Sequence, residues 1–196
     1  MSERLLEMSF RQTVRVSSDR LGALVGKQGK VKKWLEEKCS VMLEIGSDTG
    51  EVAVISGVDL EKSDPLKAVQ IVNAIARGFS PERSARLLKE ENLLDIIDLT
   101  AYTGRSKNSM ERIKGRIIGY RGKARRVLEE LTGTFVSVYG HTVAVIGTPN
   151  QVRQTQEALD MLASGSPHKA VYSMLQRKRS QVKLDRLKLW EESPPG

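Results

Sequence analysis

The chain of 196 residues is poor in the residue types on which most catalytic and metal sites depend. Its only cysteine is Cys39 and its only histidines are His141 and His168, and none has a partner at metal-ligand spacing. A single cysteine excludes an internal disulfide and suits a reducing compartment. No set of side chains forms a catalytic constellation, so the sequence predicts no metal, no cofactor and no enzymatic activity.

Long apolar stretches and nucleotide-binding motifs are also missing. No run of about 18 apolar residues occurs, and residues 1–9 lack the apolar core of a signal peptide, so we expect a cytoplasmic protein without a membrane span. The pattern G-x-x-x-x-G-K-S/T is absent, which argues against a P-loop nucleotidase. Aromatic residues make up only 5% of the chain, so base recognition cannot depend mainly on stacking.

What the chain does have is an excess of positive charge. Lys and Arg number 32 against 24 Asp and Glu, and the net charge of +8 indicates a polyanionic partner. The excess is concentrated in residues 105–126, where nine basic residues accompany one acidic residue. Helical spacing places Arg112 and Arg116 on one side of a helix. The alternative is an ordinary solvated basic face.

A block of 14 residues occurs twice. Residues 24–37 read LVGKQGKVKKWLEE and residues 117–130 read IIGYRGKARRVLEE, with six positions identical. A second shared segment follows each block, EVAVISG at 51–57 and HTVAVIG at 141–147. The glycine pairs alone are close to what composition allows. Repetition of the whole block, in the same order, indicates two copies of one module.

Both copies predict the element order β-α-α-β-β-α. In the first copy we expect a strand at 10–17, helices at 19–25 and 30–39, strands at 41–45 and 51–56, and a helix at 65–76. In the second we expect a strand at 94–99, helices at 109–118 and 123–131, strands at 135–139 and 142–146, and a helix at 150–163. The apolar run at 94–99 could also end a helix.

The helix expected at 65–76 has a clear start, because Asp64 is a good N-cap and a proline follows it. Its expected apolar face consists of Leu66, Val69, Ile71, Val72 and Ile75. The predicted fold class is α+β, with two tandem modules that each pack a three-stranded antiparallel sheet on helices. The predicted domains are 9–79 and 93–165, with a linking helix at 80–92 and a C-terminal helical extension at 167–192.

Each copy carries the pattern GxxG between its first two helices, at residues 26–29 and 119–122. A phosphate can approach a backbone closely only where no side chain intervenes, and glycine meets that condition. The next helix begins at this turn, where unpaired amides and the helix dipole favour an anion. The two inner residues of each turn should point outward. The alternative is a pair of glycines in ordinary turns between helices.

The repeated block resembles the eukaryotic-type (type I) KH domain in tandem. The segments DRLGALVGKQGKVKKWLEE, DLTAYTGRSKNSMERIKGRIIGYRGKARRVLEELTG and SVYGHTVAVIG are similar to archaeal KH-domain proteins of small-subunit ribosome assembly, relatives of the Krr and Dim/Pno factors. The resemblance covers residues 9–180. It implies binding of single-stranded ribosomal RNA or its precursor near the 3′ end of the small-subunit RNA. It also implies partnership with other assembly or processing proteins, and no catalytic activity.

By position, the resemblance assigns the clamp on about four nucleotides to the two GxxG turns. The candidate RNA-binding residues of the first copy are Gly26, Lys27, Gln28, Gly29 and Lys30. The candidates of the second copy are Arg112, Arg116, Gly119, Tyr120, Arg121, Gly122, Lys123, Arg125 and Arg126. Because its surroundings are more basic, the second copy is expected to carry more of the affinity. The alternative function is a protein-interaction scaffold with degenerate KH modules in an RNA-processing complex.

The chain departs from the common KH pattern three residues after the second glycine, where Lys32 and Arg125 replace an apolar residue. The floor of the groove is then expected to come from Leu24, Ile117, Val41 or Val136.

Residues 171–190 form an amphipathic stretch. The apolar positions that would pack back on the modules are Val171, Met174, Leu175, Val182, Leu187 and Trp190. The basic positions that could reach RNA are Arg177, Lys178, Arg179, Lys183, Arg186 and Lys188. The alternative is a packed terminal helix with a soluble face.

Overall fold

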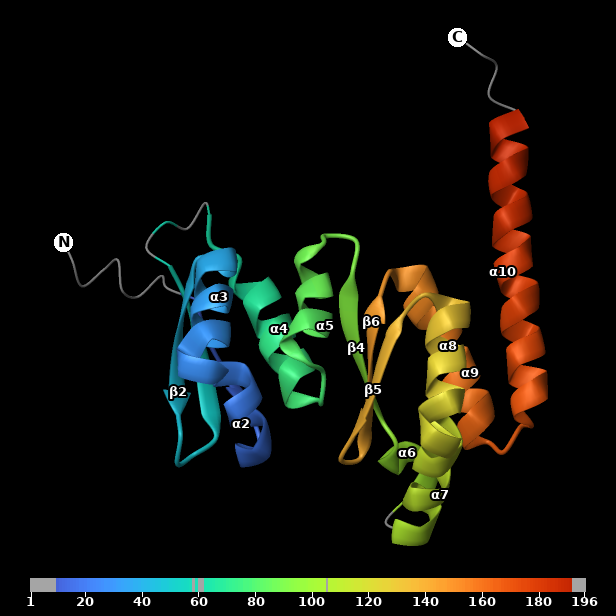
Figure 1. The fold of residues 1–196 in the computed structure, drawn as a ribbon, viewed down its shortest axis with the longest axis horizontal. Helices are drawn as coiled ribbons and strands as arrows, with labels where there is room; N and C mark the ends of the chain where they lie inside the picture. The colour runs from blue at the N-terminus through green and yellow to red at the C-terminus, as the bar shows by residue number, and fades with distance from the viewer. Residues whose placement is uncertain (1–9, 58, 60–61, 105, 192–196) are drawn as a thin grey trace, which may run out of the picture. The chain divides into compact units, whose positions relative to one another are not determined.

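A computed structural model of the chain describes residues 10–57, 59, 62–104 and 106–191, with side-chain surroundings given up to residue 184. The chain divides into two compact units, residues 1–94 and 95–196, which Figure 1 colours from blue to green and from yellow-green to red. Within the described ranges, no helix is long and apolar enough to cross a membrane.

The first unit follows the predicted order of elements, except that the linking helix predicted at 80–92 consists of two short helical segments that end at Leu88. Its sheet contains β1 (Arg11–Arg15), β2 (Val41–Gly46) and β3 (Glu51–Ser56), in the antiparallel order β1-β3-β2. Its helices are α2 (Ser18–Val25), α3 (Lys30–Cys39), α4 (Pro65–Ala76) and α5 (Pro81–Ser84), with 3-10 turns η1 (Lys27–Gly29) and η2 (Ala85–Leu88). The GxxG of the first copy lies at η1, between α2 and α3.

The second unit repeats this order. Its sheet contains β4 (Leu93–Asp98), β5 (Phe135–Tyr139) and β6 (Thr142–Gly147), in the order β4-β6-β5 with β5 and β6 antiparallel. Its helices are α6 (Thr100–Thr103), α7 (Lys107–Ile118), α8 (Lys123–Thr132), α9 (Pro149–Ala163) and α10 (His168–Glu191), with the 3-10 turn η3 (Tyr120–Gly122). Residues 94–98 lie within strand β4, so the alternative of a helix end there is wrong.

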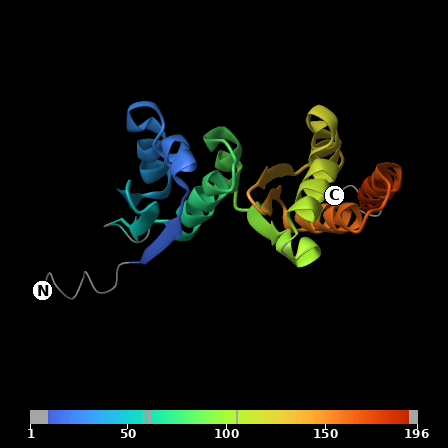
Figure 2. The same ribbon diagram turned by 90° about the horizontal axis from the view of Figure 1, so that it is seen from below.

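Helices cover one face of each sheet. In the first unit α3 packs on β2 while α4 packs on β1 and β3, and in the second α8 packs on β5 while α9 packs on β6. Figure 2 shows the helices of each unit gathered on one side of its own strands. In β2, Val41 and Leu43 point into the core while Met42 and Glu44 are exposed. The core therefore lies between the sheet and the helices, and the GxxG turn sits at its edge.

Local signals explain where the last helix of the first unit begins. The Asp64 side chain accepts a hydrogen bond from the Lys67 amide at 2.9 Å, and Pro65 occupies the first turn. Val69, Ile71, Val72 and Ile75 are buried, as predicted for this face. The inclusion of Leu66 is wrong, because its side chain is 63% exposed. It lies in the first turn, before the helix reaches the sheet.

The helix that leads into the second GxxG starts earlier than predicted. Ser106 caps α7 by accepting a hydrogen bond from the Ser109 amide at 3.3 Å, so the helix begins at Lys107 rather than at residue 109. The short helix α6 was not predicted. It consists of a single turn, which is too short to produce an apolar periodicity in the sequence.

Candidate nucleic-acid interface

The two GxxG turns have nearly the same backbone conformation. We call residues 26–29 the GKQG loop and residues 119–122 the GYRG loop. The first glycines have φ and ψ of 71° and 174° (Gly26) and 70° and 175° (Gly119). The second glycines, Gly29 and Gly122, are left-handed with φ of 74° and 76°. Both loops therefore present the same geometry at the N-terminus of the helix that follows.

The first glycine of each loop is required by packing. A Cβ on Gly26 would lie 2.4 Å from Cγ2 of Val31, and a Cβ on Gly119 would lie 2.6 Å from Cβ of Ala124 and 2.8 Å from its amide nitrogen. These distances leave no room for a side chain. The close approach lets the loop sit directly against the first turn of α3 or α8.

The second glycine of each loop has a different role. A Cβ on Gly29 or Gly122 would meet no atom within 4 Å, so the space beside it is open. Each of these glycines is the N-cap of its helix and supplies no side-chain cap. The bare backbone at a helix N-terminus, next to open space, is suited to the approach of a phosphate.

The inner residues of the loops point outward. Lys27, Gln28, Tyr120 and Arg121 are all exposed, and Tyr120 is 78% exposed. The Arg121 guanidinium carbon lies 5.3 Å from the centre of the Tyr120 ring, within cation–π range. These two side chains therefore form one projecting pair with a positive charge and an aromatic face.

The third residue of each loop is strained, which the sequence did not reveal. Gln28 and Arg121 have positive φ, 54° and 49°, although neither is a glycine. A left-handed residue with a side chain costs roughly 1–2 kcal/mol. Arg126 braces the second loop, since its guanidinium donates a hydrogen bond to the Arg121 carbonyl at 3.1 Å. This predicted RNA contact is thus also part of the loop's support.

Arg116 does not line an exposed surface beside Arg112 as expected. Its Nε donates to the Leu162 carbonyl in the last turn of α9 at 2.9 Å, and its Nη2 to the Ser166 carbonyl just after that helix at 2.5 Å. Two charge-assisted bonds to helix-end carbonyls fix the guanidinium in place. Arg116 is therefore a structural residue, whereas Arg112 is exposed.

The first unit contains an equivalent of Arg116 at a different position of the repeat. Arg20 donates from Nε to the Ile75 carbonyl at 2.8 Å and from Nη2 to the Phe79 carbonyl at 2.5 Å. In both units one arginine from the helix before the GxxG loop thus closes the end of the last sheet-packed helix. Sequence alignment missed this match, because the 14-residue block does not align the two arginines.

The repeated Leu-Glu in each copy has an architectural explanation. Leu35 and Leu128 are completely buried. The next residue ties the helix to the neighbouring strand: Oε1 of Glu36 accepts the Leu43 amide at 2.9 Å, and Oε1 of Glu129 accepts the Val136 amide at 2.8 Å. Part of the repeat therefore encodes the fold rather than a binding site.

Arg125 lies one helical turn before Glu129, so it occupies the flank of α8 that faces β5. It is half-buried, and its Nε is buried without a hydrogen-bond partner among the described residues. The matching residue of the first copy, Lys32, pairs with Glu36 at 3.7 Å. At this position between the GxxG loop and the edge strand, the first copy thus has a paired lysine. The second copy has an arginine whose Nε–H has no partner among the described residues.

The expected groove floor is wrong. Leu24, Ile117 and Val136 have no exposed surface, and Val41 is only 7% exposed. All four belong to the core between helices and sheet, where no ligand can reach them.

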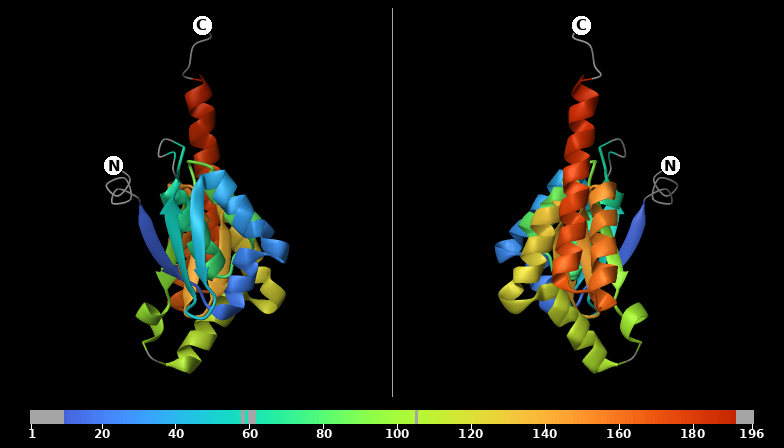
Figure 3. Two further views of the ribbon diagram at one scale, coloured as in Figure 1. Left: turned by 90° about the vertical axis from the view of Figure 1, so that its left-hand side faces the viewer. Right: turned by 90° about the vertical axis from the view of Figure 1, so that its right-hand side faces the viewer.

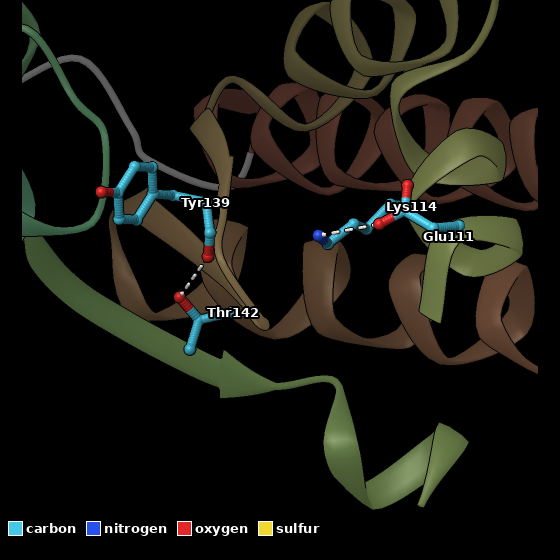
Figure 4. Close-up of polar contacts among 4 residues, drawn as sticks. All are labelled: Glu111, Lys114, Tyr139 and Thr142. Atoms are coloured by element: carbon cyan, nitrogen blue, oxygen red, sulfur yellow. Dashed lines mark hydrogen bonds and ion pairs between the residues drawn. The ribbon is translucent and has the colours of Figure 1, made fainter. Parts of the chain in front are cut away.

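The basic run of residues 105–126 is less uniformly available than its sequence suggests. Lys114 lies 3.5 Å from the Glu111 carboxylate one turn away, and Figure 4 shows the pair on α7. Lys107 and Lys123 are exposed, whereas Arg105 lies outside the described residues.

The turn between β5 and β6 is short and closed, because the Thr142 hydroxyl donates to the Tyr139 carbonyl at 3.0 Å (Figure 4).

No metal site or reactive thiol is evident in the part of the chain that the structure describes. No group of three or more His, Cys, Asp or Glu side chains there could hold a metal ion. Burial raises the pKa of Cys39 to about 11, which keeps the thiol protonated and unreactive. A ring nitrogen of His168 lies 2.8 Å from the Arg116 carbonyl, where it holds α10 against α7.

An α+β fold with a GxxG loop between two helices defines a KH-type protein. Residues 93–180 match the KH_PNO1_2nd family, a eukaryotic-type KH domain (KH-domain type I). A KH domain-containing protein of Methanocaldococcus jannaschii is 45% identical over 184 residues, which cover 92% of this chain and 79% of the relative. The chain belongs to the archaeal Dim2/Pno1-like family of KH-domain proteins.

Two further comparisons carry information on RNA. A chain in the crystal structure of an a/eIF2alpha–aDim2p–rRNA complex from Pyrococcus horikoshii OT3 is 43% identical, with a TM-score of 0.82, and the match covers 89% of this chain and 96% of that one. The pre-rRNA-processing protein PNO1 of Saccharomyces cerevisiae is 27% identical over 121 residues, which cover 60% of this chain and 43% of the relative.

Proposed function

We propose that this protein binds single-stranded RNA of the small ribosomal subunit, or its precursor, and acts as an assembly or processing factor without catalysis of its own. The observation that carries this proposal is the division of roles within each GxxG loop. Gly119 holds the GYRG loop against α8, and Gly122 leaves open space beside a helix N-terminus. The aDim2p–rRNA complex and the pre-rRNA-processing relative support ribosomal RNA as the ligand.

The clamp on the RNA backbone is centred on the GYRG loop and Lys123. Tyr120, Arg121 and Lys123 are exposed there, and Arg112 adds charge on α7. Arg116 is not part of the proposed clamp, because its guanidinium is hydrogen-bonded to carbonyls at and just after the end of α9. Arg125 and Arg126 contribute from α8, the first toward β5 and the second through its hold on the loop.

The two units are tandem KH modules, and both hold RNA. Their common element order and matching loop angles support this reading. Gly26, Lys27, Gln28, Gly29 and Lys30 form the second and weaker clamp. The only cation of α2 is Arg20, which is bound to carbonyls at the end of α4, and Lys32 is paired with Glu36.

The test replaces the two inner residues of each GxxG loop by aspartate. Tyr120→Asp with Arg121→Asp is compared with the matched variant Lys27→Asp with Gln28→Asp, using fluorescence anisotropy with a single-stranded RNA from the 3′ end of small-subunit ribosomal RNA. We expect the second-copy variant to lose roughly 100-fold in affinity, because two new carboxylates would face phosphates, and the first-copy variant to lose less. Lys89→Asp, an exposed change that belongs to neither loop, should bind nearly as the parent does.

Circular dichroism must show that the variants remain folded. Parent-level binding by the second-copy variant would disprove the assignment of its clamp. Absence of binding by the parent itself, even at low salt, would favour the protein-interaction scaffold instead.

A further inference from the structure

Helix α10 extends beyond the rest of its own unit. Val171 and Leu175 are buried near its start, where α10 packs on α8 and α9. From Gln176 to Leu184 every side chain is exposed except the half-buried Lys178, and Val182 and Leu184 are 45% and 53% exposed. Figure 3 shows α10 running back along α9 and continuing past the N-terminal end of that helix. Val182 was expected to pack back on the modules, and that expectation is wrong; the side chains of Leu187 and Trp190 lie outside the described residues.

Two hydrogen bonds define the direction of α10 relative to the GYRG loop. His168 contacts the Arg116 carbonyl at 2.8 Å, in the last turn of α7 before the loop. Further along, Nη1 of Arg179 reaches the Glu130 carbonyl at 3.5 Å, near the end of α8. Because α8 begins at the loop, α10 runs beside α8 away from the clamp.

The projecting half carries charge of one sign. Residues 176–184 contain four basic residues and no acidic one. Lys178 forms an ion pair with Glu157, whereas Arg179 donates a hydrogen bond to the backbone carbonyl of Glu130. Arg177 and Lys183 are exposed and have no partner among the described side chains.

Like charges one turn apart destabilise a solvated helix by a few tenths of a kcal/mol per pair, and a bound polyanion would reverse that effect. An exposed valine and leucine within this basic stretch could instead contact a protein. The net charge, with no acid among the described residues of this half, favours a phosphate backbone.

We propose that residues 176–184 of α10 form a second RNA-contacting surface, which binds the phosphates of the strand after it leaves the GYRG clamp. This inference rests on the proposed function of that clamp. This surface is roughly 14 Å long at 1.5 Å per residue. A stacked strand covers that length in about four nucleotides. The surface contacts the backbone alone, so it extends the binding site without adding sequence preference.

The experiment uses the full chain and two labelled RNAs that share one small-subunit 3′-end sequence. One has about four nucleotides, the length that a KH clamp covers, and the other about 12. The variant is Arg177→Gln with Lys183→Gln. The matched control, Lys89→Gln with Arg153→Gln, removes the same charge from exposed sites elsewhere.

We expect the α10 variant to bind the long RNA about 5- to 10-fold more weakly at moderate salt. Its slope of log K against log salt should be smaller by about 1.4, at roughly 0.7 per lost phosphate contact. Its binding of the short RNA should equal the parent's, which also shows that the clamp remains folded. The control variant should match the parent on both RNAs.

Equal affinity and equal salt slope of parent and variant on the long RNA would overturn the proposal and leave a protein partner for this half of α10. An equal loss on both RNAs would overturn it too, because the effect would then be a general one of charge. Failure of the clamp itself has a different signature: the parent would not bind the short RNA, or the variant carrying Tyr120→Asp and Arg121→Asp would bind it normally.

Discussion

The sharpest prediction concerns the two glycines of the GYRG loop, which should fail in different ways when each is replaced by alanine. Gly119 has φ of 70° and ψ of 175°, a region that only glycine adopts readily. Its new Cβ would also lie 2.8 Å from the Ala124 amide, which belongs to helix backbone and cannot move aside. Gly122 is left-handed, and its new Cβ would meet no atom within 4 Å.

The expected magnitudes follow from these differences. For Gly119→Ala, backbone strain of about 1–3 kcal/mol adds to a comparable cost of overpacking, so we expect a loss of about 3–5 kcal/mol in the free energy of unfolding. For Gly122→Ala, the strain of a left-handed alanine alone predicts about 1 kcal/mol. In a unit of about 100 residues that smaller loss lowers Tm by about 4–8 °C.

The assays are urea unfolding followed by circular dichroism, and RNA binding at a temperature where each variant is folded. Gly122→Ala should keep its fold yet lose at least about 10-fold in affinity, or about 1.4 kcal/mol, because the methyl group fills the space that the phosphate would enter. Gly26→Ala and Gly29→Ala give the matched pair in the first unit. Equal stability losses for Gly119→Ala and Gly122→Ala, or parent-level RNA binding by Gly122→Ala, would refute the division of roles.

Three further predictions test the surroundings of the clamp. Arg116→Ala should lower the stability of the second unit by about 2–3 kcal/mol in urea unfolding, with RNA affinity kept while the variant is folded, since its guanidinium holds the end of α9. Arg125→Met should raise the free energy of unfolding by about 1 kcal/mol and weaken RNA binding, because it removes a buried Nε–H that has no partner among the described residues and that a phosphate could satisfy; lower stability would contradict this. Cys39 should react with a disulfide reagent at pH 8 about 100-fold more slowly than an ordinary thiol until the protein is unfolded, because burial raises its pKa from 9.0 to about 11 and the thiolate is the reactive form.

The sequence predicted most of the fold because its strongest signals are local. Alternation of apolar residues, the Asp64 cap and the GxxG turns placed α3 and α4 with the boundaries that the structure has. The same reasoning failed where a single turn of helix left no periodicity, at α6, and where a helix position is apolar but exposed, at Leu66. Both wrong predictions concern how much of a helix lies against the core, which the spacing of apolar residues does not indicate.

The site was harder to predict because the role of a charged side chain depends on which residues it contacts in the folded protein. Arg112 and Arg116 share one helix face by spacing, yet Arg116 turns to two carbonyls that are 46 and 50 residues away in the sequence. The positive φ of Gln28 and Arg121 was equally invisible, since neither residue type indicates a left-handed turn. Tertiary contacts decide both features.

These observations divide the basic run around the GYRG loop into two groups with different consequences. Arg116, Arg126 and Lys114 are engaged with α9, the loop carbonyl and Glu111. Lys107, Arg112, Arg121 and Lys123 are exposed, as Arg126 also is despite its bond to the loop, and a phosphate backbone can neutralise their charges. The salt dependence of RNA binding should therefore reflect the exposed group, while losses of stability should follow the engaged one. A run of charge that looks uniform in the sequence thus acts partly as scaffold and partly as ligand surface.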